Sequence, residues 1–145
     1  MELYTMGEKI MFEYYVKKVT KVVDGDTIDV DIDLGFDISF SSRVRLAGID
    51  TPESRTTDKA EKVLGLEAKA YLKAAIDSAK SVVIKTEKMD SSEKYGRILG
   101  WVYLDGDTVS INDKMINDGH AWGYMGETKV KDFDALKKAR AKSGK

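Results

Sequence analysis

The hydrophobic and polar positions at the start of the chain predict three consecutive strands. Residues 12–23 are rich in β-branched and aromatic residues, a composition that favours a strand. Residues 24–26 (Asp-Gly-Asp) predict a tight turn, because Asp-Gly readily supplies the positive φ of a hairpin. Over residues 28–34, Ile, Val or Leu alternates with Asp, which predicts a strand with one apolar and one acidic face. Gly35 ends it, and residues 38–49 return as the third strand.

The second half of the chain predicts helices and two further strands. Residues 59–80 are rich in Ala, Lys and Glu, which favours a long helix. Apolar residues recur there at near-helical spacing, at Val63, Leu66, Ala70, Tyr71, Leu72, Ala74 and Ile76. Residues 81–86 and 96–104 have the composition of strands. A short helix is expected over residues 110–118 and a last one over residues 132–142.

This order of elements predicts an α+β fold that is mainly β. Three meandering strands, a helix, two strands and terminal helices match a five-stranded Greek-key barrel of the OB type with about three packed helices. A chain of 145 residues suits one domain, which we expect over residues 12–145. Residues 1–11 are weakly patterned, and we expect them to form a flexible lead-in.

The composition limits the kinds of metal site that the chain can hold. It has no Cys and a single His, His120, so thiolate sites and zinc sites with several histidines are excluded. Any bound metal must therefore be held by oxygen atoms. His120 itself is expected to be a structural residue.

Charge is nearly balanced overall but unevenly distributed. The net charge of −1 argues against broad attraction to polyanions. Residues 24–38 nevertheless contain six Asp and no base, whereas residues 129–145 contain seven Lys or Arg against two Asp. Residues 1–18 are interrupted by charges and have no apolar core for a secretory signal, and no later stretch could span a membrane. We expect a cytoplasmic protein without a membrane partner.

The richest chemistry lies in residues 45–53, Arg-Leu-Ala-Gly-Ile-Asp-Thr-Pro-Glu. A buried strand here runs into Pro52, which cannot continue a β-ladder because it has no N–H. Asp50 and Glu53 would then lie at a strand end, where functional side chains are common. A solvated turn after a core strand is the alternative explanation of these acids.

Three separated segments together resemble the thermonuclease (staphylococcal-nuclease-like) family. They are residues 23–28 (Val-Asp-Gly-Asp-Thr-Ile), 44–53 (Val-Arg-Leu-Ala-Gly-Ile-Asp-Thr-Pro-Glu) and 93–97 (Glu-Lys-Tyr-Gly-Arg). Residues 65–68 (Gly-Leu-Glu-Ala) and 119–124 (Gly-His-Ala-Trp-Gly-Tyr) extend the resemblance in the same order. Each motif alone is weak, but the series with this spacing is specific.

The resemblance implies a calcium-dependent phosphodiesterase that hydrolyses DNA and RNA and leaves 3′-phosphate products. Asp26 and Asp50 correspond to the calcium carboxylates of the family, and the Thr51 carbonyl completes the protein ligands. Hard oxygen ligands of this kind suit Ca²⁺. Glu53 corresponds to the residue that orients or deprotonates the attacking water.

The same resemblance implies a set of substrate-binding residues. Arg45 and Arg97 correspond to the two phosphate-binding arginines, whose planar fork suits a phosphate better than a Lys point charge. Lys94 and Tyr95 correspond to the pair that contacts the terminal phosphate. Tyr124 is the candidate for the aromatic residue that packs on the nucleotide, with ordinary packing as the alternative.

Two further expectations concern geometry and partners. Strict alternation would put Arg45 and Asp50 on opposite faces of a strand, so Gly48 should mark a bend or bulge. We expect a monomer that prefers single-stranded or unpaired DNA and RNA, because the low net charge gives little attraction to a rigid duplex. The alternatives are a catalytically inactive module that binds nucleic acid or protein, and a plain OB-fold binder of single strands.

Overall fold

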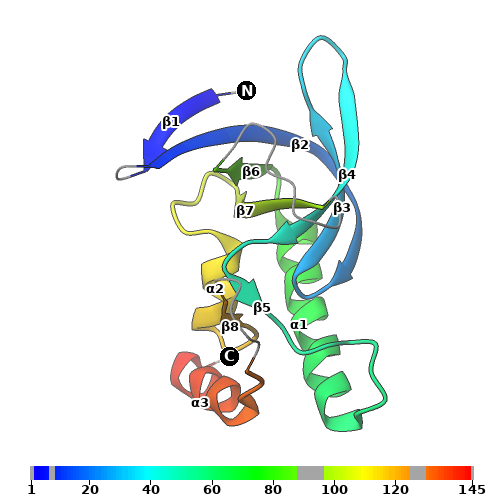
Figure 1. The fold of residues 1–145 in the computed structure, drawn as a ribbon, viewed down its shortest axis with the longest axis vertical. Helices are drawn as coiled ribbons and strands as arrows, with labels where there is room; N and C mark the ends of the chain where they lie inside the picture. The colour runs from blue at the N-terminus through cyan, green and yellow to red at the C-terminus, as the bar shows by residue number, and fades with distance from the viewer. Residues whose placement is uncertain (1, 7–8, 88–96, 125–129, 145) are drawn as a thin grey trace.

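The computed structural model describes residues 2–6, 9–87, 97–124 and 130–144. Its helices are α1 (Lys59–Ser78), α2 (Ile111–Asn117) and α3 (Phe133–Ser143). Its strands are β1 (Glu2–Met6), β2 (Lys9–Asp24), β3 (Thr27–Asp33), β4 (Ser39–Leu46), β5 (Ile49–Asp50), β6 (Val82–Thr86), β7 (Ile98–Leu104) and β8 (Trp122–Gly123). Figure 1 shows the sheet curled at one end of the molecule, with α1 extending from it, α2 next to α1, and α3 below α2.

Five strands close into a barrel of mixed direction, as the sequence predicts. β2, β3 and β4 form an antiparallel meander, and β4 then pairs in parallel with β7. β7 pairs with β6, and β6 pairs back to β2, which closes the circle. The pairing of β2 with β3 shifts register between Val16 and Lys18, and again further along. Such bulges increase twist and help a long strand to curve around a barrel.

The barrel interior is filled by the alternating apolar residues of its strands. Ile28, Val30 and Ile32 of β3 are all buried, whereas the intervening acids are partly exposed. Val44 and Ile84, from β4 and β6, are completely buried in the same cluster. The period of two in the sequence therefore reports which face of the sheet points inward.

Helix α1 covers the barrel with only some of its apolar residues. The Asp58 side chain caps its first turn by accepting from two backbone N–H groups. Its buried apolar residues include Leu64, Ala68 and Leu72, a row four residues apart that continues to Ile76. Of the apolar residues noted in the sequence, Leu72 and Ile76 are buried, whereas Val63 and Leu66 are 58% and 46% exposed. A row of small and branched residues at i, i+4 packs closest to the barrel and displaces them.

The N-terminal segment is more regular than expected. Residues 1–11 were expected to form a flexible lead-in, whereas the structure places Glu2–Met6 in β1 and begins β2 at Lys9. β1 pairs with residues 9–13 of β2, on the edge opposite β6. Pairing with a strand that is already ordered supplies hydrogen bonds that the weak sequence pattern does not indicate.

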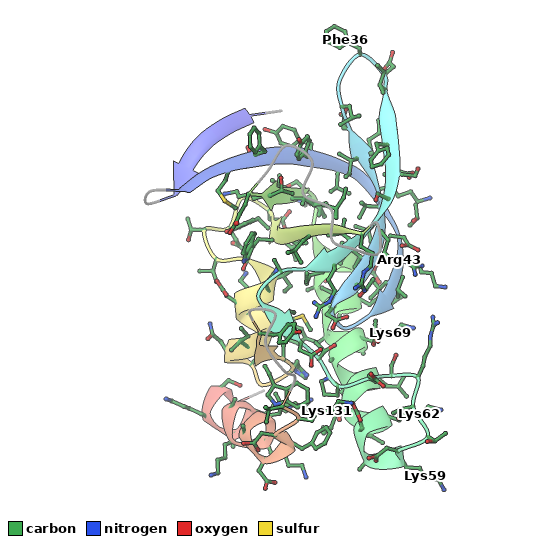
Figure 2. The ribbon with its side chains drawn as sticks, in the orientation of Figure 1. Phe36, Arg43, Lys59, Lys62, Lys69 and Lys131 are labelled. Carbon is green, nitrogen blue, oxygen red and sulfur yellow. The ribbon has the colours of Figure 1, made fainter. Side chains whose placement is uncertain are left out.

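The β3–β4 hairpin extends beyond the barrel and away from the helices (Figure 1). Its tip bends through Gly35, Phe36 and Asp37, all of which have positive φ. Phe36 is 98% exposed and points into solvent at the far end of the molecule (Figure 2). In the part of the chain that the structure describes, no helix combines the length and apolarity that a membrane crossing requires.

Candidate active site

A bend at Gly48 gives the site its shape. β4 ends at Leu46 and β5 begins at Ile49, and Gly48 between them has a φ of 76°. A glycine adopts this left-handed conformation without the steric cost that a side chain adds. The backbone N–H of Tyr124 donates to the Gly48 carbonyl at 2.8 Å and fixes the bend to the segment after α2. The bend predicted from the sequence is therefore confirmed.

The turn between β2 and β3 places Asp26, for a reason other than the predicted one. Gly25 was expected to provide a positive φ, but its φ lies outside that region. A Cβ atom at Gly25 would instead lie 2.9 Å from the Ala68 Cβ and 3.0 Å from the Thr51 Oγ1. Glycine is required here because the turn packs directly against α1 and the segment after β5. The Thr27 hydroxyl then donates to Asp26 Oδ1 at 2.9 Å.

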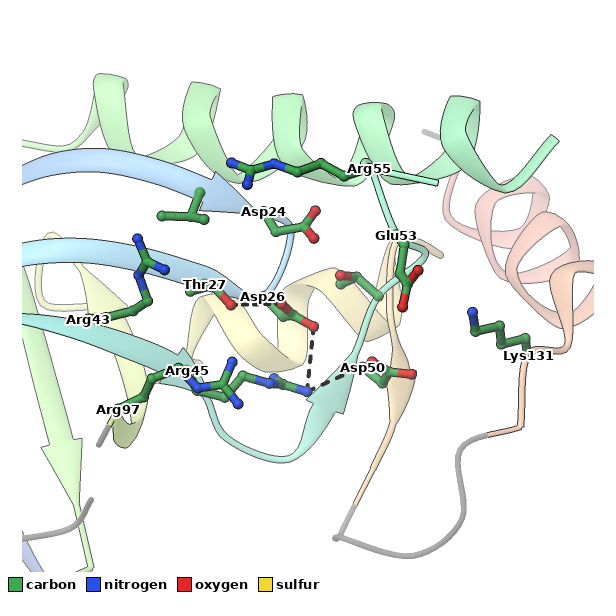
Figure 3. Close-up of a pocket in the computed structure, with 12 residues that line it drawn as sticks. Asp24, Asp26, Thr27, Arg43, Arg45, Asp50, Glu53, Arg55, Arg97 and Lys131 are labelled. Atoms are coloured by element: carbon green, nitrogen blue, oxygen red, sulfur yellow. Dashed lines mark hydrogen bonds and ion pairs between the residues drawn. The ribbon is translucent and has the colours of Figure 1, made fainter. Parts of the chain in front are cut away.

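These segments enclose a cavity of about 270 Å³ (Figure 3). Six residues predicted from the sequence line it together: Asp26, Arg45, Asp50, Thr51, Glu53 and Arg97. The other lining residues are Val23, Asp24, Thr27, Arg43, Arg55 and Lys131. Carboxylates thus occupy the middle of the pocket, and cations come from several separate elements.

Arg45 is the centre of the ion pairs in this pocket. Its guanidinium donates to the Leu46 carbonyl at 2.6 Å and to the Ile49 carbonyl at 2.8 Å, so the bend itself holds the side chain. The same group lies 3.4 Å from Asp26 Oδ2 and 3.8 Å from Asp50 Oδ1. Arg45 is 8% exposed. Two nearly buried carboxylates therefore share this guanidinium, which favours a further cation beside them.

The oxygen atoms near Asp26 and Asp50 are chemically suited to calcium. Among the residues that the structure describes, no three His, Cys, Asp or Glu side chains form a metal cluster. The donor set would consist of two carboxylates and the Thr51 backbone carbonyl, with water for the remaining positions. The Thr51 hydroxyl is buried and makes no hydrogen bond in the structure. This hydroxyl is a further oxygen on the residue whose carbonyl would complete the donor set.

Glu53 lies on the loop between β5 and α1, with its side chain exposed at the pocket. Its backbone N–H donates to Glu61 Oε2 at 3.1 Å. Glu61 belongs to the first turn of α1 and is only 5% exposed. Lys131 completes the group, because its Nζ lies 2.9 Å from Glu61 Oε2. The loop that carries Glu53 is therefore anchored to α1 and to the segment before α3.

Comparison with known proteins shows the family of the chain. The family described as staphylococcal nuclease homologue matches residues 43–145, well over half of the chain. The chain belongs to this family. The family match begins after Asp26, which the β2–β3 turn brings to the pocket.

Several relatives of this staphylococcal nuclease homologue come from bacteria and archaea. The SPbeta prophage-derived endonuclease YokF of Bacillus subtilis is 34% identical over 119 residues, which cover 81% of this chain and 38% of that protein. Endonuclease YncB of the same organism is 32% identical over 128 residues, which cover 86% of this chain and 57% of that protein. The uncharacterized protein MJ1439 of Methanocaldococcus jannaschii is 26% identical over 138 residues, which cover 83% of this chain and 64% of that protein. The chain thus spans less than two thirds of the length of these relatives.

Four charged residues of the pocket were missed by sequence reasoning. Arg43 lies two residues before Arg45 in β4, so strand alternation could have indicated it, whereas Arg55 lies in the loop after β5, where no such period applies. Arg43 pairs with Asp29 across the β3–β4 ladder at 2.8 Å. Asp24 belongs to the motif of residues 23–28, so the sequence could have indicated it. No local sequence pattern indicates Lys131.

Burial raises the pKa of the Asp24 carboxyl, although hydrogen bonds from Ser54 and the Gly25 N–H oppose the change. Asp24 thus differs from an ordinary surface acid. Asp24 lies at the pocket wall, and the negative charge of nearby Asp26 also raises the pKa of Asp24.

Of the three predicted substrate-binding residues, Tyr124 is the one that the structure describes. Lys94 and Tyr95 lie outside the described residues. Tyr124 is half-buried and is not among the described residues that line the cavity. Its role against a nucleotide stays a prediction.

Proposed function

We propose that this protein is a calcium-dependent phosphodiesterase that hydrolyses DNA and RNA and leaves 3′-phosphate products. The observation that carries the proposal is the convergence of guanidinium groups and carboxylates from three separated segments on one cavity. Membership of the staphylococcal nuclease homologue family supports it, and so do two relatives that are named endonucleases.

Hydrolysis of a phosphodiester needs cations where negative charge accumulates in the transition state. Arg45 and Arg97 line the same pocket, and each guanidinium can offer two parallel N–H groups to phosphate oxygens. Arg45 is already oriented by the Leu46 and Ile49 carbonyls, so little conformational entropy is lost when it binds a phosphate. These two residues would clamp the non-bridging oxygens.

Asp26, Asp50 and the Thr51 carbonyl would hold the calcium ion. When bound, calcium would neutralise phosphate charge and help to orient the substrate. The same two carboxylates also pair with Arg45, so they fix the guanidinium relative to the metal position. This arrangement explains why a cation and two acids occur so close together in one loop and one turn.

Glu53 would orient or deprotonate the attacking water. Its carboxylate faces the pocket from a loop that Glu61 holds through the backbone, so the side chain is free to face the substrate. A general base must lie within hydrogen-bond reach of the water that it activates. Glu53 and Asp50 line the same pocket, which supports this role.

The decisive experiment replaces Glu53 by Gln. This change keeps the shape of the side chain but removes its basicity, and loss of general-base help typically lowers the rate about 10²- to 10⁴-fold. Single-turnover cleavage of a short labelled oligonucleotide, with calcium and with chelator, measures the effect. Asp37→Asn removes one negative charge at the distant hairpin tip and serves as the control, with an unchanged rate expected.

Binding measured in parallel separates an enzyme from a binding module. Glu53→Gln should still bind calcium and the oligonucleotide, because the two aspartates and the two arginines are untouched. A rate within about threefold of the parent would exclude a general-base role for Glu53. If neither protein cleaves but both bind nucleic acid, the module is the correct description.

A further inference from the structure

We propose that Lys131 is a substrate-binding residue that contacts the phosphate next to the scissile one. The inference rests on the proposed nuclease function and extends the site beyond the residues of the sequence motifs. It assigns to the segment before α3 a direct part in binding a polynucleotide strand.

Lys131 lies on the wall of the pocket opposite the arginines. Figure 3 shows Arg45 and Arg97 on one side, Asp50 and Glu53 in the middle, and Lys131 on the other side. A strand whose scissile phosphate lies at the arginines would extend past the acidic centre. Its neighbouring phosphate would meet repulsion there unless a cation lies beyond the acids. Among the described lining residues, Lys131 provides a cation on that side.

The Lys131 side chain is held in place by a buried acid. Its Nζ contacts both oxygens of Glu61, at 2.9 and 3.2 Å, and Glu61 is 5% exposed. An ammonium group has three N–H donors, so two can serve Glu61 while the third faces the pocket. The Lys131 side chain is 38% exposed, so a ligand can reach it.

The surroundings of Lys131 keep it charged. The hydrogen bond to Glu61 raises the pKa of the Lys131 ammonium, although burial opposes the change. The charges of Glu53 and Asp50 raise it further. An ammonium group is a point charge without a fixed plane, so it suits a phosphate whose orientation varies between substrates, whereas the planar arginines suit the fixed scissile phosphate.

A purely structural role for Lys131 makes a different prediction. If the residue only neutralised Glu61, its loss would disturb the Glu53 loop and lower the rate for every substrate alike. If it binds the neighbouring phosphate, its loss would matter only when that phosphate carries a charge. The two roles can therefore be separated by changing the substrate.

The test combines Lys131→Met with single-stranded oligonucleotides in which one phosphate beside the scissile one is an uncharged methylphosphonate. On the unmodified oligonucleotide we expect kcat/KM of Lys131→Met to fall about tenfold, mainly through a higher KM. This factor corresponds to the lower end of the free energy of a hydrogen bond to a charged group. With the methylphosphonate on the side that Lys131 contacts, parent and variant should be equal. Lys131→Arg should restore most of the loss, and the salt slope of binding should decrease by about 0.7 in Lys131→Met.

Lys138→Met is the matched control, because Lys138 is an exposed lysine of α3 and lies outside the pocket lining. It should behave like the parent with every oligonucleotide. Equal losses of Lys131→Met on charged and uncharged substrates, or no loss at all, would overturn the assignment. If the parent fails to cleave the unmodified strand, the proposed function fails instead. Binding of the same oligonucleotides to the parent would then test Lys131 by the same comparison.

Discussion

Gly65 lets the loop that carries Glu53 lie directly on helix α1. A Cβ atom at this position would lie 2.3 Å from the Glu53 carbonyl oxygen and 2.6 Å from the Ser54 nitrogen. Glycine inside a helix costs about 1 kcal/mol relative to alanine, so helix stability alone would favour Ala here. The close approach of backbone to backbone therefore explains the glycine, and links a residue in the middle of α1 to the position of a candidate general base.

Gly65→Ala should lower activity more than it lowers stability. The helix gains intrinsic stability, but the Glu53–Ser54 peptide must move to relieve contacts of 2.3 to 2.6 Å. A displacement of this kind can lower a catalytic rate about 10²-fold. Single-turnover cleavage and thermal unfolding measure the two effects. Ala70→Gly, on the exposed side of the same helix, controls for helix propensity and should reduce stability with an unchanged rate.

Residue-level chemistry was predictable from the sequence where it lies in a short motif. Arg45, Asp50 and Glu53 lie within nine residues, and Pro52 and Gly48 indicate how the chain leaves the sheet there. Glu61 could not be recognised in this way. It is an ordinary helix residue in the sequence, and it acquires a role only because folding brings Lys131 and the Glu53 N–H to its carboxylate.

At the scale of elements, a polar network around His120 joins the three helices. Tyr71 of α1 donates to Asp118 after α2, and its ring centre lies 4.5 Å from that of His120. Arg140 of α3 pairs with Glu67 of α1 at 3.1 Å. His120 is 9% exposed, and its Nδ1 makes no hydrogen bond in the structure. A protonated imidazole is therefore disfavoured in the folded protein.

This network predicts a loss of stability in mild acid. Burial lowers the pKa of His120 below its usual value of 6.5, and the charge of Arg140 lowers it further, whereas Glu67 and Asp118 oppose the shift. As pH falls below 6.5, the unfolded chain binds the proton first, so the free energy of unfolding decreases. Above that pH the imidazole is neutral in both states and the stability is fully present.

The prediction is checked by denaturant unfolding of the parent and of His120→Gln at about pH 7.5 and about pH 5.5. The parent should lose more stability than the variant over this interval, because only the parent carries the titrating imidazole. Other groups titrate equally in both proteins and cancel in the comparison. Equal losses would show that His120 does not contribute.

Helices and strands were predictable where the sequence has a regular hydrophobic pattern. They were less predictable where a strand forms only because it pairs with a neighbouring strand. The alternation in β3 and the composition of α1 indicated a strand and a helix close to their observed limits. β8 (Trp122–Gly123) has no such pattern, since it exists through its pairing with β5. β1 likewise depends on the neighbouring β2. Short strands of this kind are determined by the tertiary structure more than by their own residues.

At the scale of the whole molecule, positive and negative charges nearly cancel. The net charge is −1, and the β3–β4 hairpin carries Asp29, Asp31, Asp33 and Asp37. One edge of the molecule in Figure 2 carries Arg43, which pairs with Asp29, and the lysines Lys59, Lys62 and Lys69 of α1. Long-range attraction to a polyanion is therefore weak, and binding depends on contacts made inside the pocket.

This balance predicts a preference for single-stranded or unpaired nucleic acid. The scissile phosphate must reach Arg45, which is 8% exposed, and a flexible strand can bend into such a cavity whereas a rigid duplex cannot without unpairing. Matched labelled strands, single or annealed to a complement, should differ at least tenfold in initial rate at moderate salt, an order-of-magnitude expectation from the cost of opening base pairs. Raising salt should slow both in parallel, because the same few phosphates are contacted. Equal rates on the two forms would contradict this prediction and would indicate a surface that recognises the duplex.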